Sequence, residues 1–259
     1  MRSIYLSLLI ALTTFSAHSA MAQTTKQKFC KERENKHFVR NQMMTKISAH
    51  MGFRNYGGLL NGGVCWWHSR FHRNALYLGI FRPEYSKPSE DEAKTIIKAI
   101  RRGRSVVEIP GYRNLREFSI DNDHLIQNEL EAWQRTDGFI NQQWVIGLLG
   151  TAKRSENGMR KMMDGLYDRV VNQGDVTYQK LQIKGIDAHA WLVVDMKKTR
   201  TGYTLYAVDS NFPGELQKVR YNYGDKFFHY NRWYGEFAPY TGRKVEIKRV
   251  KKVIKEFCE

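Results

Sequence analysis

The sequence predicts an α+β fold, with a helical N-terminal half packed against an antiparallel β-sheet in the C-terminal half. Up to about residue 174, apolar residues recur mostly at helical spacing, whereas beyond it short β-branched and aromatic segments alternate with turn residues. The 259 residues are 42% hydrophobic and 13% aromatic, which is enough to bury a sizeable core. We therefore expect one domain over residues 23–259, with a helical lobe over about 23–174 and a β lobe over about 175–259.

The first 22 residues have the features of an export signal. Arg2 gives a positive start, residues 4–12 are mostly apolar, and Ala20-Met21-Ala22 fits the small-x-small rule for cleavage. The apolar stretch is too short to span a bilayer comfortably, and no later segment offers a long uncharged apolar run. We expect cleavage after Ala22 and a secreted or periplasmic protein without a transmembrane span, the alternative being an uncleaved membrane anchor.

Helical patterns account for most of the chain up to residue 174. Ser89 and Glu92 form a capping box, which predicts a helix over 90–102 that ends near Gly103. The other expected elements of this half are helices at 26–50, 64 to about 81, 121–135 and 156–172, a glycine-rich loop at 55–63 and a short strand in SVVEI.

Four segments beyond residue 174 have the pattern of strands joined by hairpins: VTYQKLQI, HAWLVVDM, GYTLYAVDS and LQKVRYNY. The tail GRKVEIKRVKKVIKEF intersperses apolar residues among lysines and arginines. We expect it to bury one face and to expose a basic one.

The charge is strongly positive. The formal net charge is +16, and it becomes +15 when Arg2 leaves with the signal. Such an excess favours contact with polyanions, which include nucleic acid, anionic lipid and acidic cell-wall polymers. The chain has neither zinc-finger spacing nor an aromatic RNA-binding motif. We therefore expect an anionic envelope polymer or surface as a partner, and no specific nucleic acid.

The three cysteines fit an exported protein. Cys30 lies near the expected mature start and Cys258 near the end, so a disulfide between them would tie the termini together in an oxidising compartment. Cys65 would then remain as a free thiol. In the alternative pairing, Cys65 forms the disulfide with one of the other two.

Cys65 stands where a nucleophile would be activated. It follows Gly62-Gly63 and opens a predicted helix, where backbone N–H groups lack intrahelical partners and the helix dipole is positive. Both effects favour the thiolate, which is the reactive form of cysteine. The two glycines allow unusual dihedral angles and a close approach of substrate.

A base and an orienting acid follow in the β half. His189 begins one predicted strand and Asp209 ends the next, so antiparallel pairing brings them opposite each other. A carboxylate beside the imidazole would fix its tautomer and stabilise the imidazolium. Asn211 is the alternate orienting residue. Taken singly, each of these residues also has a purely structural interpretation.

This ordered set resembles the papain-like cysteine peptidase superfamily. Cys65-Trp66 is similar to the papain-type cysteine followed by tryptophan, while His189-Ala190-Trp191 and Val208-Asp209 look more like the transglutaminase-like branch. Two features depart from the pattern. Leu59 stands where papain-type enzymes carry their oxyanion glutamine, so we take Asn61 and the Cys65 N–H as the substitutes. Ser-Asn-Phe-Pro follows Asp209, in place of an Asp-Pro-type ending.

The resemblance implies a papain-like or transglutaminase-like fold with its active site in a cleft between the halves. It also implies an exported, thiol-dependent acyl-transfer enzyme, a cysteine peptidase or amidase that hydrolyses a peptide or isopeptide bond in a protein or cell-wall peptide. No cofactor is required. The expected groove residues are Trp66, His68 and Trp191. Transglutaminase-like amine transfer is one alternative, and a non-catalytic polyanion-binding protein on the same scaffold is another.

A zinc site is the rival interpretation of the cysteine helix. Cys65, His68 and His72 share one helix face, and all three are residue types that bind zinc. One helix rarely closes a coordination shell, however, and the residue after His68 is not the Glu of the zinc-protease helix motif. We therefore expect no metal.

Overall fold

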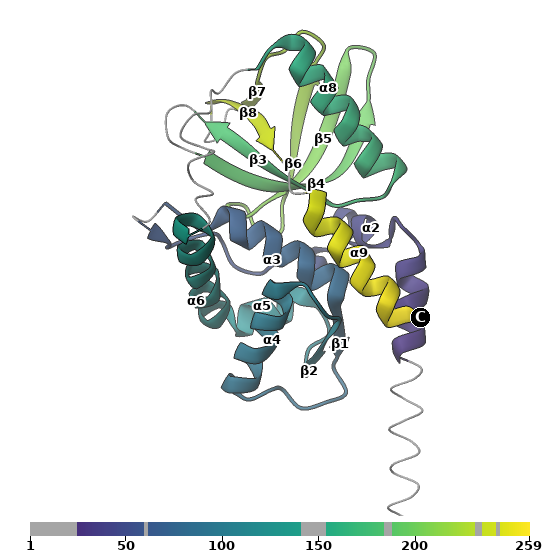
Figure 1. The fold of residues 1–259 in the computed structure, drawn as a ribbon, viewed down its shortest axis with the longest axis vertical. Coiled ribbons are helices and arrows are strands. Elements are labelled where there is room, and N and C mark those ends of the chain that lie inside the picture. The colour runs from purple at the N-terminus through teal and green to yellow at the C-terminus, as the bar shows by residue number, and fades with distance from the viewer. Residues whose placement is uncertain (1–24, 60–61, 141–153, 184–187, 231–234, 242–243) are drawn as a thin grey trace, which may run out of the picture.

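The computed structural model describes residues 25–59, 62–140, 154–183, 188–230, 235–241 and 244–259. Helices and one large antiparallel sheet occupy separate regions of the molecule, with the sheet above the main group of helices in Figure 1. The predicted α+β class is thereby confirmed. The predicted signal peptide, residues 1–22, lies outside the described residues.

The helical region surrounds helix α3 (Cys65–Leu78). A helix over residues 25–34 and α2 (Phe38–Thr45) precede it, and a two-stranded parallel sheet of β1 and β2 adjoins it. The remaining elements here are η1 (Ile47–Ala49), β1 (Gly79–Arg82), α4 (Glu90–Arg102), β2 (Val107–Pro110), α5 (Leu115–Asp121), α6 (Asp123–Gln134) and the π-helical turn η3 (Arg135–Ile140).

Helix α3 is buried on nearly all sides, because α4, α6, α9 (Lys244–Cys258) and strand β4 all contact it. Its polar residues therefore need partners inside the protein. The Arg70 guanidinium lies 2.6 Å from Asp137 of η3 and 2.6 Å from Glu246 of α9, and Arg73 lies 2.9 Å from the same glutamate. These ion pairs fix α3 against elements that come much later in the chain.

The large sheet contains β3 (Thr177–Ile183), β4 (Ala188–Lys198), β5 (Gly202–Asp209), β6 (Leu216–Asn222), β7 (Phe228–Tyr230) and β8 (Gly235–Thr241). The strand order is β6-β5-β4-β3-β8-β7, and all neighbours are antiparallel. The four strands expected from the sequence are β3 to β6. Strands β7 and β8 were not expected from the sequence, and β7 is only three residues long.

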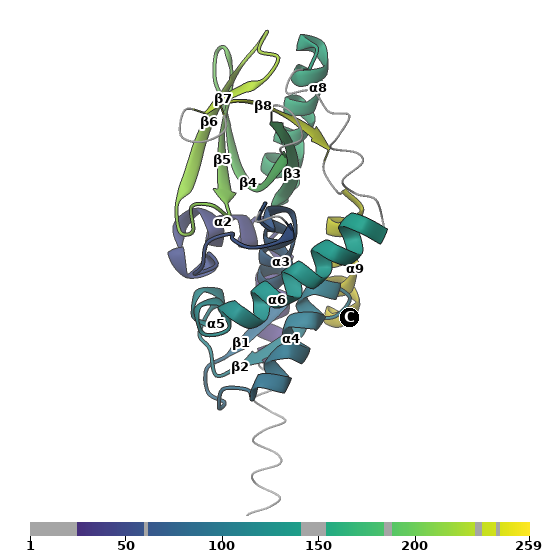
Figure 2. The same cartoon turned by 90° about the vertical axis from the view of Figure 1, so that its left-hand side faces the viewer.

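Helices pack on both faces of the sheet, although they cover the face opposite α8 only in part; Figure 2 shows α8 along one side of the sheet and the other helices at its lower end. Helix α8 (Glu156–Tyr167) packs Met159, Met163 and Leu166 onto one face. Helices α2 and α3 pack against the other face near the strand ends that adjoin the helical region. The large sheet thus lies between α8 and the main helical core.

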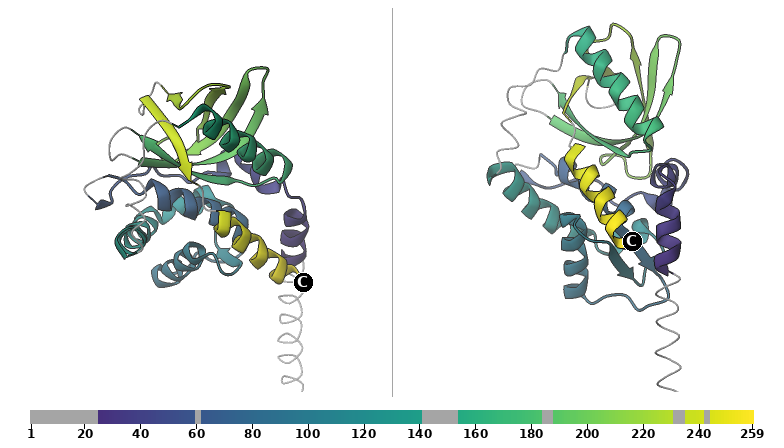
Figure 3. Two further views of the ribbon diagram at one scale, coloured as in Figure 1. Left: turned by 45° about the horizontal axis from the view of Figure 1, so that its top comes forward. Right: turned by 45° about the vertical axis from the view of Figure 1, so that its right-hand side comes forward.

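The two lobes are not bounded at residue 174 as the sequence suggested. Helix α8 precedes that residue but packs on the sheet, and α9 ends the chain but returns to the helical region, where Ile247 and Val250 join the core around α3. Figure 3 shows α9 beside the N-terminal helix. Amphipathic patterns identify which face of a helix is buried, but not which other element covers it.

Several element boundaries also differ from the expected ones. The region expected as one helix over 26–50 is divided into a helix over 25–34, α2 and η1. Helix α3 ends at Leu78 instead of about 81, because Gly79 begins β1. The helix over 90–102 has its predicted limits: Glu92 accepts a hydrogen bond from the Ser89 N–H at 2.8 Å, and Gly103 ends the helix at φ 59°.

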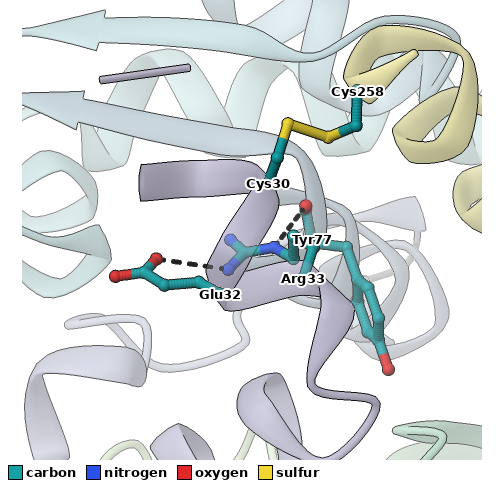
Figure 4. Close-up of a disulfide and its surroundings, with 5 residues drawn as sticks. All are labelled: Cys30, Glu32, Arg33, Tyr77 and Cys258. Atoms are coloured by element: carbon teal, nitrogen blue, oxygen red, sulfur yellow. Dashed lines mark hydrogen bonds and ion pairs between the residues drawn. A yellow bond between two sulfur atoms is a disulfide. The ribbon is translucent and has the colours of Figure 1, made fainter. Parts of the chain in front are cut away.

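A disulfide joins Cys30 to Cys258, as drawn in Figure 4, and leaves Cys65 free. The neighbouring Phe29 and Phe257 make an edge-to-face contact with ring centroids 5.6 Å apart. Arg33 donates hydrogen bonds to the carbonyls of Tyr77 and Leu76, at 3.0 and 2.8 Å. The N-terminal helix is therefore attached to both α9 and the end of α3.

Among the helices that the structure describes, none has both the length and the apolar character needed to cross a bilayer.

Candidate active site

Cys65 is the first residue of α3, as the sequence predicts. The loop before it turns sharply at Gly63, whose φ of 79° lies in the left-handed region that favours glycine. A Cβ at Gly63 would lie 2.6 Å from the Asn55 side-chain nitrogen. Because Cys65 begins the helix, its N–H has no intrahelical acceptor and the positive end of the dipole lies at the thiol.

Helix α6 supports this loop through side-chain hydrogen bonds. The Gln134 side chain accepts a hydrogen bond from the Leu59 N–H at 2.9 Å and donates one to the Gly63 carbonyl at 3.0 Å. The Glu131 carboxylate accepts a third from the Gly58 N–H at 3.1 Å. The glycine-rich segment is therefore held by specific polar contacts on both sides of residues 60–61.

His189 and Asp209 meet where β4 and β5 pair. Trp191 of β4 lies opposite Asp209 of β5, so His189, two residues earlier on the same strand, reaches the carboxylate. Its Nε2 lies 2.8 Å from Asp209 Oδ1, and the two residues are only 3% and 1% exposed. The His189 side chain also forms a hydrogen bond with Cys65. Because Nε2 of His189 faces Asp209, we assign the hydrogen bond with the Cys65 sulfur to Nδ1, the other ring nitrogen.

The surroundings favour a protonated His189. Burial alone would lower the pKa of this imidazole, but the negative charges of Asp209 and Cys65 and its hydrogen bonds to both raise the pKa to about 10. The ring therefore carries a positive charge between sulfur and carboxylate at neutral pH. An imidazolium in contact with a cysteine stabilises the thiolate.

Asn55 connects the two halves of the candidate site. Its Oδ1 accepts a hydrogen bond from the Val64 N–H at 2.6 Å, and its Nδ2 donates to Asn211 Oδ1 at 3.0 Å. The Asn211 N–H in turn donates to Asp209 Oδ1 at 2.8 Å. A continuous chain of hydrogen bonds thus runs from the residue before Cys65 to the carboxylate that contacts His189.

Asn211 was expected as an alternate residue to orient His189, but the structure shows it in contact with Asn55 and Asp209. Its side-chain oxygen accepts a hydrogen bond from Asn55, and its backbone N–H donates one to Asp209. The carboxylate of Asp209 is the group in contact with His189. Asn211 therefore supports Asp209 through a backbone hydrogen bond.

The residues expected to line a groove are instead buried, with Trp66 5%, His68 2% and Trp191 1% exposed. Trp66 is covered by Lys180 of β3, whose ammonium lies 3.6 Å from the ring centroid. Trp191 faces the core under α8 and donates to Gln179 at 2.8 Å. Trp191 and Val193 share a face of β4, as the alternation predicts, but α8 covers that face, so Trp191 is core and not groove.

The histidines of α3 are embedded in the core. Burial lowers the pKa of His68 to about 4 and that of His72 to about 3, so both are neutral at pH 7. His72 Nε2 lies 2.8 Å from the Ala49 carbonyl. Among the residues that the structure describes, no group of three or more histidine, cysteine or acidic side chains is placed to hold a metal ion.

Asn61, expected to stabilise an oxyanion, lies outside the described residues. Cys65 itself is buried, with 6% of the residue exposed, and it belongs to the hydrophobic core around α3. A cavity of about 500 Å³ lies elsewhere, between the N-terminal helix, α2 and β1, and none of its lining residues belongs to the candidate triad.

Asn55 and Gln134, which support the loop before Cys65, were not expected from the sequence. Asn55 lies ten residues before Cys65, and Gln134 ends a helix far along the chain. Both bind the loop through single side-chain amides. A lone amide has no spacing signal in a sequence, so only the folded arrangement identifies these residues.

Comparison with family models, curated proteins and solved structures gives no match for this chain.

Proposed function

We propose that this chain is a thiol-dependent acyl-transfer enzyme that hydrolyses a peptide or isopeptide bond. The observation that carries the proposal is the convergence of Cys65, His189 and Asp209, which lie on α3, β4 and β5 and form one hydrogen-bonded series. A nucleophile, a base and an orienting acid in this order constitute a catalytic arrangement. The thiol at a helix start facing a histidine and an acid on paired strands is what a papain-like or transglutaminase-like enzyme would have.

In the proposed reaction, the Cys65 thiolate attacks the carbonyl carbon of the amide. The tetrahedral oxyanion is stabilised by the Cys65 N–H. His189 gives its Nδ1 proton to the leaving nitrogen, the C–N bond breaks, and a thioester remains. Water then attacks the thioester, His189 takes a proton from it, and cleavage of the C–S bond restores the thiolate.

We further propose that the protein acts outside the cytoplasm on a protein or cell-wall peptide. The signal-like N-terminus supports this location, and so does the disulfide between Cys30 and Cys258, since disulfides persist in oxidising compartments. A net charge of +16 would favour retention on an anionic envelope.

Alkylation by iodoacetamide at pH 7 tests the site without knowledge of the substrate, because Cys65 is the free cysteine. We expect rapid labelling in the wild type and labelling about tenfold slower, or less, in His189→Ala, which loses the imidazolium that stabilises the thiolate. His124→Ala is the matched control, since that side chain is 65% exposed. Equal, slow labelling in all three proteins would favour a non-catalytic, polyanion-binding protein.

Bond cleavage is tested by incubating the full chain with a peptide mixture in ¹⁸O-labelled water. Hydrolysis through a thioester places ¹⁸O in new C-termini, and Cys65→Ser should abolish this incorporation. If an added primary amine is joined to the acyl group and ¹⁸O is not incorporated, the enzyme is a transferase of the transglutaminase-like kind. The absence of both products would contradict the proposed chemistry.

A further inference from the structure

A cationic surface lies on the large sheet, on the face opposite α8 and beyond the part that α2 and α3 cover. Thr204 of β5 pairs with Lys197 of β4 on one side and with Arg220 of β6 on the other. In the next row Tyr206 pairs with Lys218. We call Lys197, Lys218 and Arg220, with Arg200 in the adjoining turn, the basic face.

All four cations of the basic face are exposed. Lys197 lies over the Tyr206 ring at 5.5 Å, and no carboxylate in the described part of the chain pairs with any of the four. Asp195 shares a row with Tyr206, but it already pairs with Arg40 at 3.5 Å. The basic face therefore has an excess of positive charge that this part of the protein does not neutralise.

Like charges on one face of a sheet repel one another, here with β5 between the strands that carry Lys197 and Arg220. Neighbouring strands are about 4.8 Å apart, so Lys197 and Arg220 stand about 10 Å apart across Thr204. Lysines on an edge strand such as β6 also protect against aggregation. That role does not explain Lys197, which lies on β4, two strands in from the edge. A bound polyanion would remove the repulsion at all of these positions.

From this arrangement we infer that the basic face is a binding site for an acidic polysaccharide, a linear chain with repeated carboxylate, sulfate or phosphate groups. Single-stranded nucleic acid is the poorer match, because binding it calls for several stacking aromatic rings and Tyr206 is the aromatic residue among the paired positions of this face. A lipid surface is also the poorer match, because Leu216 and Val208, the aliphatic residues beside Lys218 and Tyr206 on this face, pack against the core and do not project to enter the acyl region.

The basic face extends away from the candidate active site, from Lys218, whose partner Tyr206 is three residues (about 10 Å) before Asp209, to Lys197. Lys197 lies eight residues beyond His189 on β4, and the rise of a strand separates them by about 25 Å. A polysaccharide bound there would hold the protein on its matrix. This inference does not depend on the proposed function, since Cys65→Ser should bind as tightly as the wild type.

The experiment measures binding of the full chain to dextran sulfate and to polygalacturonate by calorimetry at 150 mM salt. We expect Lys197→Gln, Lys218→Gln and Arg220→Gln together to weaken binding by about tenfold or more. The matched control, Lys248→Gln, Lys252→Gln and Lys255→Gln, removes the same charge from exposed positions on α9 and should change affinity by less than about threefold.

If the two triple variants weaken binding equally, binding depends on net charge alone, and the basic face is not a specific site. Absence of binding by the wild type would overturn it as well. Anionic vesicles of phosphatidylglycerol and phosphatidylcholine, and single-stranded DNA, are tested in parallel. If either binds more tightly than both polysaccharides, with the same dependence on the basic face, the assignment to a polysaccharide is wrong. Thermal unfolding verifies that each variant is folded.

Discussion

His189 is the residue on which the chemistry of the candidate site depends. Burial disfavours its charged form, while Asp209 and Cys65 favour it more strongly, so the net effect raises the pKa to about 10. Asp209 is itself 1% exposed, so its charge is little screened by water. The protonation state of the site is therefore decided by two neighbouring side chains and not by the helix start alone.

Asp209→Asn tests this dependence. Without the carboxylate, burial should dominate and lower the pKa of His189, so the imidazolium beside Cys65 would be lost at neutral pH. We expect the rate of Cys65 alkylation at pH 7 to fall by about two orders of magnitude. The pH profile of alkylation and the NMR titration of His189 measure the effect. If both profiles match those of the wild type, Asp209 has no such role.

At the scale of elements, the candidate site depends on how a loop and a hairpin are joined. The loop before α3 and the turn after β5 lie far apart in sequence, and Asn55 spans them through Val64 and Asn211. The backbone N–H of Asn55 also donates to the Ser210 carbonyl at 2.7 Å. These bonds fix the distance between the start of α3 and the end of β5.

Asn55→Ala should therefore affect reactivity beyond its effect on stability. The loss of two partly buried side-chain hydrogen bonds should reduce the free energy of unfolding by about 1–3 kcal/mol. It should also slow Cys65 alkylation and shift its pH profile, because the thiol is no longer held against His189. Denaturant unfolding and alkylation rates are measured together.

Asn114→Ala is the control for this variant, since Asn114 caps α5 by accepting a 3.0 Å hydrogen bond from the Glu117 N–H. It should cost about 1 kcal/mol of stability and leave alkylation unchanged. If Asn55→Ala also leaves the pH profile unchanged, Asn55 is a structural residue only.

Sequence periodicity identified most elements but not their arrangement. The hairpin of β4 and β5 brings His189 close to Asp209, whose direct cross-strand partner is Trp191, because antiparallel register follows from a short hairpin. The alternation in β4 did not show that Trp191 would be buried, since this depends on α8, which covers that face. Asn55 and Gln134 left no pattern either, because their contacts arise only when distant segments meet.

For the whole molecule, the disulfide closes nearly the entire described chain, with a sequence separation of 228 residues between Cys30 and Cys258. It attaches the N-terminal helix to α9, which in turn contacts α3 through Glu246. A covalent link that joins such distant positions restricts the unfolded chain strongly. The helical region is therefore held at both termini.

Removing the disulfide with Cys30→Ser and Cys258→Ser should lower the free energy of unfolding by about 2–5 kcal/mol, measured by denaturant titration. The reduced wild type should show a similar loss. Peptide mapping without reduction should give one cross-linked peptide, which contains Cys30 and Cys258. A cross-link to Cys65 would contradict both the pairing and the free nucleophile.

Stability should depend on pH on both sides of a maximum near pH 6.5. The folded-state pKa of His68 is about 4 and that of His72 about 3, below the ordinary 6.5, so their contribution is present above pH 6.5 and is lost as pH falls. The folded-state pKa of His189 is about 10, so its contribution is complete below pH 6.5 and is lost as pH rises toward 10.

Thermal unfolding midpoints across this range check the expectation. Between pH 6.5 and about 4.5 most carboxylates remain charged, so a decline there reports the buried histidines. Asp209→Asn should remove the alkaline decline, because His189 would no longer have a raised pKa. A midpoint that stays constant from pH 4.5 to pH 9 would contradict the buried, neutral state of His68 and His72 and the charged state of His189.

The sequence by itself determined the α+β class, the strands β3 to β6, the helix that starts at Cys65, and the three residues of the candidate triad. These features follow from local periodicity, from capping and from the register of one hairpin. Only the tertiary structure decided which faces of the sheet are covered and which side-chain amides support the loop before Cys65. It also decided that α8 packs on the sheet and that α9 packs on the helical region. Such features depend on contacts between segments far apart in the chain, and no local pattern of residues encodes those distances.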